Sequence, residues 1–146
     1  MLSKNFTSNY DLARYATELN LPVVAIVYKD DLYKLPNRYG GFILNSDDIG
    51  NAGKHWISFF VPKNGKYSYY MDSYGIYPPE AVKAYSKRMG KVDIIFNTKQ
   101  IQTLRSGYCG SYCLLFLYYM QKKKGSYKDR FNKYLNLFKE NNTNNI

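Results

Sequence analysis

The chain has 146 residues, of which 45% are hydrophobic and 18% aromatic, with 17 tyrosines. This length and composition exclude an intrinsically disordered chain and predict one folded domain over residues 1–146. The net charge of +10 favours anionic partners and predicts weak, salt-dependent binding of nucleic acid, although dispersed lysines also suit an ordinary solvated surface.

Periodicity divides the chain into helices and strands. The predicted elements, in chain order, are a helix over 10–19, strands over 23–28 and 42–45, a hairpin of strands over 55–61 and 66–72, a helix over 80–89, a strand over 92–97, and helices over 109–122 and from 127 onward. Asn9 is expected to cap the first helix and Ser126 the last. The helix over 109–122 is apolar almost all round, which predicts a central place in the fold. Residues 141–146 are expected to form a disordered tail.

Sequence features also bear on the compartment of the protein. Two cysteines four positions apart do not form the pattern of a secreted disulfide framework. No charged segment followed by an apolar core marks a secretory signal. The longest apolar run, 114–120, is far shorter than the roughly 20 residues of a membrane-spanning helix. We therefore expect a protein of a reducing compartment that is not secreted and does not enter a membrane.

The segment 102–113 carries the strongest chemical signal. Cys109 lies at the predicted start of a helix, where unpaired backbone N–H groups and the helix dipole favour a thiolate. Gln102, seven residues upstream, supplies an amide donor of the kind that completes an oxyanion hole. Cys113 falls one turn deeper in the helix and is expected to be packed and inert.

The hairpin provides a candidate base and acid. His55, the one histidine of the chain, and Asp72 lie at the open end of the two predicted strands. A four-residue turn would place His55 directly opposite Asp72. A two-residue turn at 64–65 would place Asp72 opposite Ile57 and diagonal to His55. Both registers keep the two side chains on one face, where the carboxylate can orient the imidazole as a base for Cys109.

Each of these residues also has a structural explanation. A cysteine is often a buried apolar filler, a histidine at a strand end can be structural, and 72–75 can be a plain turn. Such explanations prevail for each residue alone, whereas the combination favours a catalytic site. Trp56 points to the sheet face opposite His55 in a regular strand, where core packing and the lining of a substrate groove explain it equally well.

Three segments, 53–56, 70–75 and 102–113, together resemble the adenovirus-type maturation protease, adenain, which is related to the Ulp-like deSUMOylating proteases. The order His, acid, Gln, Cys is that of the family, as are the separations of 17 and seven residues. The Gln-to-Cys offset and the Cys-Gly-x-aromatic-Cys run resemble the viral branch, including proteases of virophages and Polinton-like elements. Adenain has Glu where this chain has Asp72, and it is longer after the Cys helix.

The resemblance covers roughly residues 8–120 and implies an α+β, papain-like and adenain-like core. In that core a central helix carrying Cys109 packs on a mixed, mostly antiparallel sheet that bears His55 and Asp72. The resemblance also implies cleavage after glycine, at Gly-Gly-x or Gly-x-Gly-like sites in viral capsid and core precursors. Trp56 would cover a narrow glycine channel.

The resemblance also sets expectations about cofactors and location. The chemistry requires no metal and no cofactor, and DNA, which activates adenain, is a candidate activator. We expect a monomer that acts in the virion and at the virus assembly site of the host cell.

Two other functions remain open at this point. One is an isopeptidase that removes ubiquitin-like modifiers, with a related acyltransferase less favoured. The other is an inactive nucleic-acid-binding or virion structural protein on the same fold. The intact set of Cys, His, Asp and Gln disfavours an inactive protein, whereas the basic charge is common to all of these functions.

Overall fold

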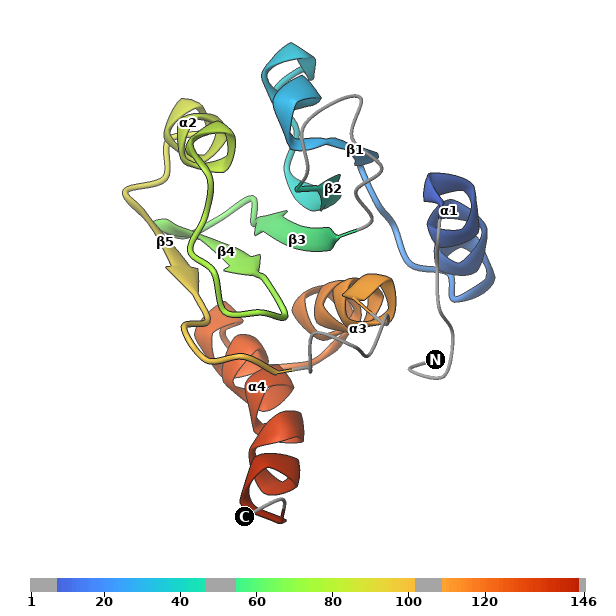
Figure 1. The fold of residues 1–146 in the computed structure, drawn as a ribbon. Coiled ribbons are helices and arrows are strands. Elements are labelled where there is room, and N and C mark those ends of the chain that lie inside the picture. Colours follow the sequence, from blue (N-terminus) through green and yellow to red (C-terminus); the bar gives the residue numbers. More distant parts are fainter. Residues whose placement is uncertain (1–7, 47–54, 102–108, 145–146) are drawn as a thin grey trace.

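The computed structural model describes residues 8–46, 55–101 and 109–144, with side chains as far as Phe138. A five-stranded mixed sheet lies at the centre, and helices cover both of its faces (Figure 1). The elements in chain order are α1 (Asn9–Glu18), β1 (Ala25–Tyr28), the 3-10 helix η1 (Lys29–Lys34), β2 (Gly40–Asn45), β3 (Trp56–Val61), β4 (Tyr67–Met71), α2 (Glu80–Arg88), β5 (Asp93–Phe96), α3 (Cys109–Lys122) and α4 (Tyr127–Asn144).

The strands lie in the order β1-β2-β3-β4-β5. The central strand β3 pairs antiparallel with both β2 and β4, and the outer strands β1 and β5 pair parallel with their neighbours. Parallel neighbours cannot be joined by a tight turn, and accordingly η1 lies between β1 and β2 and α2 between β4 and β5. The mixed sheet predicted from the sequence is confirmed, and its antiparallel part is the central hairpin with β2.

The register of the β3–β4 hairpin decides between the two predicted alternatives. Ser58 pairs with Met71 and Phe59 with Tyr70, so continuing the ladder places Asp72 opposite Ile57. This is the register of the two-residue turn. Gly65, at that turn, has φ +93°, a left-handed conformation that glycine adopts without a steric penalty.

Alternate residues of β3 enter two different cores. Trp56 and Phe60 pack in the core under α1, α3 and α4, whereas Ile57 and Phe59 pack in the core under η1 and α2. All six residues of β3 are buried as a result. A strand covered on both faces is apolar along its whole length, which explains why His55 is followed by an unbroken run of mostly apolar residues.

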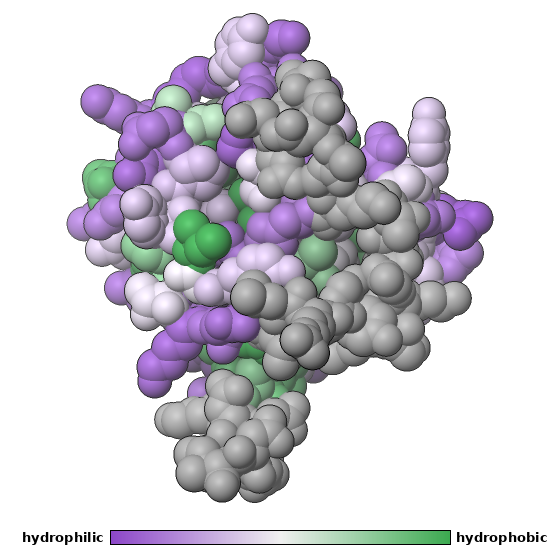
Figure 2. Space-filling model, in the orientation of Figure 1, coloured by the Kyte–Doolittle hydropathy of each residue, from purple (hydrophilic) through white to green (hydrophobic). Residues whose placement is uncertain are grey.

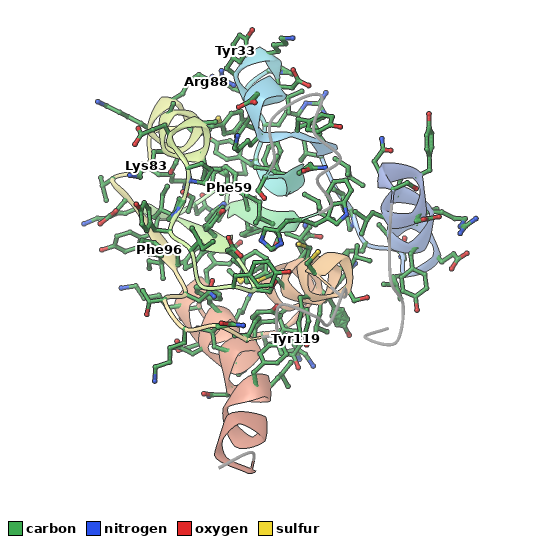
Figure 3. The ribbon with its side chains drawn as sticks, viewed as in Figure 1. Tyr33, Phe59, Lys83, Arg88, Phe96 and Tyr119 are labelled. Atoms are coloured by element: carbon green, nitrogen blue, oxygen red, sulfur yellow. The ribbon has the colours of Figure 1, made fainter. Side chains whose placement is uncertain are left out.

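The layer of η1 and α2 is fastened at its outer end by Arg88. Its guanidinium donates hydrogen bonds to the carbonyl oxygens of Tyr33 (3.1 Å) and Leu35 (2.6 Å) and lies over the Tyr85 ring, 4.5 Å from the centroid. Figure 3 shows Tyr33 and Arg88 together at this outer end, while Phe59 lies between the layers. Arg88 therefore ties α2 to η1.

Two helix ends differ from the sequence prediction. The N-cap of α1 is Ser8, whose Oγ accepts a hydrogen bond from the Asp11 N–H (3.2 Å), and not Asn9. Serine and asparagine cap equally well, so the sequence alone does not separate the two positions. Helix α4 begins after the predicted cap Ser126 but runs to Asn144, into the segment predicted to be a disordered tail. No glycine or proline interrupts it there.

The face of the molecule seen in Figure 2 is mainly polar. In the view of Figure 2, hydrophilic residues spread over the molecule, and hydrophobic residues form only small, separate areas. Among the helices that the structure describes, none has both the length and the apolar character needed to cross a bilayer.

Candidate active site

His55 and Asp72 meet at the open end of the hairpin. His55 directly precedes β3 and Asp72 directly follows β4, which places them diagonally across the ladder. The His55 Nε2–H group donates a hydrogen bond to Asp72 Oδ1 at 2.8 Å. Both side chains are largely buried. Because Nε2 holds its proton toward the carboxylate, Nδ1 is the nitrogen left for proton transfer.

Cys109 reaches this site from another layer of the fold. It is the first residue of α3, which packs across β3, and it is only 5% exposed. The backbone N–H of Trp56 donates a hydrogen bond to Cys109 Sγ at 3.4 Å. The buried Nδ1 of His55 has no oxygen or nitrogen partner among the described residues. His55 therefore lies between a carboxylate and a thiol.

The surroundings of His55 favour its charged form. Burial of the ring lowers the pKa, but the hydrogen bonds to Asp72 and Cys109 and the negative charge of both groups outweigh burial and raise the pKa of His55 to about 9. At neutral pH the ring is therefore an imidazolium. A neighbouring imidazolium stabilises a cysteine thiolate, which is the nucleophilic form.

Tyr74 is a site residue that the sequence analysis missed. Its ring stacks on the His55 ring with 4.2 Å between centroids and 9° between planes. Its backbone N–H also donates a hydrogen bond to Asp72 Oδ1 at 2.9 Å. The turn after β4 thus contacts both His55 and Asp72. An aromatic residue two positions after the acid was the available signal.

Asn97, directly after β5, was missed as well. Its side chain exchanges two hydrogen bonds with the backbone of Asp72. Nothing in the local sequence marks this residue, because the contact depends on β5 lying beside β4.

A side chain at Gly75, in the turn of 72–75, is expected to clash with neighbouring backbone atoms. This residue has φ +78°, and an added Cβ would lie 2.9 Å from Thr98 O and Lys99 C, both backbone atoms. We expect Gly75→Ala to lower the free energy of unfolding by about 2–4 kcal/mol and to weaken the hold on Asp72. Urea unfolding measures the first effect, and the alkylation rate of Cys109 measures the second.

Gly90→Ala is the matched control for this prediction. Gly90 has nearly the same backbone angle, φ +81°, but an added Cβ there would meet no atom within 4 Å. It should cost only the strain of a left-handed residue, about 1 kcal/mol, and leave Cys109 unaffected. Equal losses in the two variants would show that contact with 98–99 is unimportant.

The remaining predicted site residues have different outcomes. Gln102 lies outside the described residues, so its oxyanion role stays a prediction. The Trp56 side chain is buried in the core that also contains Cys109, and its role toward a substrate stays a prediction. Cys113 is completely buried, and burial, with the nearby Cys109, raises the pKa of its thiol. Among the described residues, no group of three or more His, Cys, Asp or Glu side chains could hold a metal ion.

Comparison with solved structures shows that the chain has the fold of a protease. A structure of the ASFV pS273R protease in selenomethionine form has a TM-score of 0.59 and 20% identity, over 88% of this chain and 61% of that one. A second structure of this protease gives a TM-score of 0.57 and 20% identity, over 88% and 60%. The chain thus spans about three fifths of that protease's length. The predicted α+β fold class is confirmed.

The other comparisons gave no match. No family model and no curated protein matches the chain. At 20% identity the likeness to the ASFV protease concerns the fold, so the chemistry rests on the residues themselves.

Proposed function

We propose that this chain is a cysteine endopeptidase. The observation that carries the proposal is the placement of the His55 ring between Asp72, at 2.8 Å, and the Cys109 thiol at the start of α3. These three side chains come from three segments: the residue before β3, the residue after β4 and the first residue of α3. The fold shared with the ASFV pS273R protease supports the same conclusion.

The geometry supports a two-step acyl transfer. The Cys109 thiolate attacks the scissile carbonyl carbon, and the carbonyl electrons move onto the oxygen. When the C–N bond breaks, His55 gives its Nδ1 proton to the leaving amine, and a thioester remains on Cys109. His55 then removes a proton from water, which attacks the thioester and releases the acid. Asp72 keeps Nε2 protonated throughout and stabilises the imidazolium.

Stabilisation of the oxyanion requires donors near the nucleophile. Cys109 is the first residue of α3, and a helix N-terminus directs backbone N–H groups and the positive end of the helix dipole toward a negatively charged oxygen. Gln102 is proposed as the side-chain donor on the basis of its offset from Cys109. Trp56 is proposed to limit the substrate channel through its side chain.

The proposed substrates are viral capsid and core precursors cleaved after glycine, at Gly-Gly-x or Gly-x-Gly-like sites. This finer assignment rests on the resemblance to adenain-type proteases. DNA is proposed as an activator because of the net charge of +10, and action by a monomer in the virion and at the assembly site is part of the same proposal. No cofactor is proposed for the chemistry.

An isopeptidase is the second candidate. Asp72 favours it, because the Ulp-like branch has Asp at the acid position where adenain has Glu. A substrate panel distinguishes the two: peptides with internal Gly-Gly-x sites, and ubiquitin-like proteins carrying a C-terminal fluorogenic amide. The panel is run with and without double-stranded DNA.

We expect cleavage of the internal Gly-Gly-x peptides, since a viral precursor protease needs no folded modifier. Preference for the folded ubiquitin-like substrates would favour the isopeptidase. If neither class of substrate is cleaved and DNA binds strongly, the result would contradict the enzyme and favour a nucleic-acid-binding protein.

A further inference from the structure

At the end of the β4–β5 ladder, a side chain makes hydrogen bonds that the backbone of a strand would otherwise make. The parallel pairing continues to Tyr70 and Phe96. One step beyond, the Asn97 side chain takes the place of the strand: the Asp72 N–H donates to Asn97 Oδ1 (3.1 Å), and Asn97 Nδ2 donates to the Asp72 carbonyl (2.7 Å). The backbone of Asp72 is thus held at both of its polar groups by one amide.

The amide of Asn97 makes a third hydrogen bond. Its Nδ2 also donates to the carbonyl of Lys99 at 3.1 Å, so both of its N–H groups are used. The neighbouring backbone is tied to the same turn, because the Ile101 N–H donates to the Ser73 carbonyl at 2.8 Å. Asn97 is 4% exposed, so water competes little for these bonds.

Only asparagine fits this arrangement well. The oxygen faces one N–H group, and the nitrogen faces two carbonyl oxygens. An aspartate would turn a carboxylate oxygen toward those carbonyls, and a leucine would leave all three partners unsatisfied in a buried place. The contacts with Asp72 and Lys99 therefore require an asparagine at position 97.

We propose that Asn97 is a positioning residue that fixes the Asp72 carboxylate at hydrogen-bonding distance from His55. The proposal rests on the proposed cysteine-protease function and adds a second support for the acid: Asn97 holds its backbone, whereas the Tyr74 N–H group contacts its carboxylate. Fixing the backbone of Asp72 at N and O leaves its carboxylate few ways to turn away from the imidazole. A small displacement of the acid weakens a short, charge-assisted hydrogen bond.

The single histidine of the chain makes this proposal measurable. The ring resonances of His55 report its titration by NMR without any substrate. In the described part of the chain, the ionisable groups around it are Asp72, Cys109 and Tyr74. Because the hydrogen bond to Asp72 is the strongest contribution that raises the pKa of His55, a loosened Asp72 lets burial lower that pKa.

The experiment compares wild type with Asn97→Ala and Asn97→Ser. We expect wild-type His55 to titrate near pH 9, and Asn97→Ala to titrate at least about one pH unit lower. Asn97→Ser, which keeps one hydroxyl, should lie between them. Ser86→Ala is the control: Ser86 is equally buried and bonded to Ser68 of β4, so its loss disturbs the same strand away from the site.

A double-mutant cycle tests whether Asn97 acts through the acid. In an Asp72→Asn background, Asn97→Ala should change the His55 titration by less than a quarter of its effect in wild type. Alkylation of Cys109 by iodoacetamide, followed against pH with Cys113 as internal reference, gives the same comparison at the nucleophile. Unfolding midpoints identify any variant that does not fold.

The outcomes separate the two proposals. If wild-type Cys109 is not alkylated selectively, the protease proposal fails. If Cys109 is selective and folded Asn97 variants titrate like wild type, only the role of Asn97 fails. Additive effects in the cycle would show that Asn97 affects His55 independently of Asp72, and unfolding of both Asn97 variants would assign Asn97 to stability alone; either result overturns the positioning role.

Discussion

Cys109→Ala is expected to abolish cleavage, with kcat/KM falling by about 10⁴-fold or more. Alanine keeps the helix start and removes only the sulfur that attacks the carbonyl. The fold should be retained, because α3 keeps its contacts with β3 and α4. Peptide cleavage followed by mass spectrometry measures the loss, and circular dichroism establishes that the variant is folded.

Cys113→Ala is the matched control, since it removes the same atom one helical turn away. Cys113 is fully buried and its raised pKa keeps it a neutral thiol, so it should contribute packing and no chemistry. We expect a loss of about 1 kcal/mol of stability and cleavage within a few-fold of wild type. The assignment of the nucleophile is wrong if Cys113→Ala is the inactive variant.

Asp72→Asn is the second large effect, with an expected loss of about 10³- to 10⁴-fold in kcat. The amide is nearly the same size as the carboxylate but carries no charge to stabilise the imidazolium. It also permits the tautomer in which Nδ1, and not Nε2, carries the proton. Steady-state kinetics at several pH values should show the reduced kcat of the variant. They should also show a His55 titration displaced to lower pH.

The same pair predicts how stability depends on pH. The pKa of His55 is 6.5 in an unperturbed chain and about 9 in the folded protein, so the folded state binds its proton more tightly. The resulting stabilisation, on the order of 3 kcal/mol, is complete below pH 6.5 and is lost as the pH rises to 9. Urea unfolding at pH 6 and pH 9.5 should show this loss in wild type and much less of it in Asp72→Asn. An equal loss in both would rule out the carboxylate as its source.

Local patterns were sufficient for much of this fold. The bounds of α3 were predicted correctly, because its apolar run ends in lysines and a glycine that stop a helix. The hairpin was also predicted, but its register was not, since 62–65 suits turns of two lengths. Both registers placed His55 near Asp72, which is why their contact was predicted without knowing the register.

Features that depend on tertiary contacts could not be predicted from the sequence. Asn97 supports Asp72 across 25 positions of chain, through a parallel pair whose partners no turn signal connects. Tyr74 is close to Asp72 in sequence, but its stacking on His55 depends on the diagonal register. The helical state of 141–144 was missed because asparagine favours helix interiors only weakly.

The hydrogen bond from the Trp56 N–H to Cys109 Sγ is made by the main chain. Every residue type except proline has a backbone N–H group. Substitutions of Trp56 other than proline therefore keep the hydrogen bond to the Cys109 sulfur. Mutational tolerance at position 56 will therefore report on the indole alone. A saturation scan that compares neighbouring codons 55 and 56 would separate selection for proton transfer from selection for the shape of a side chain.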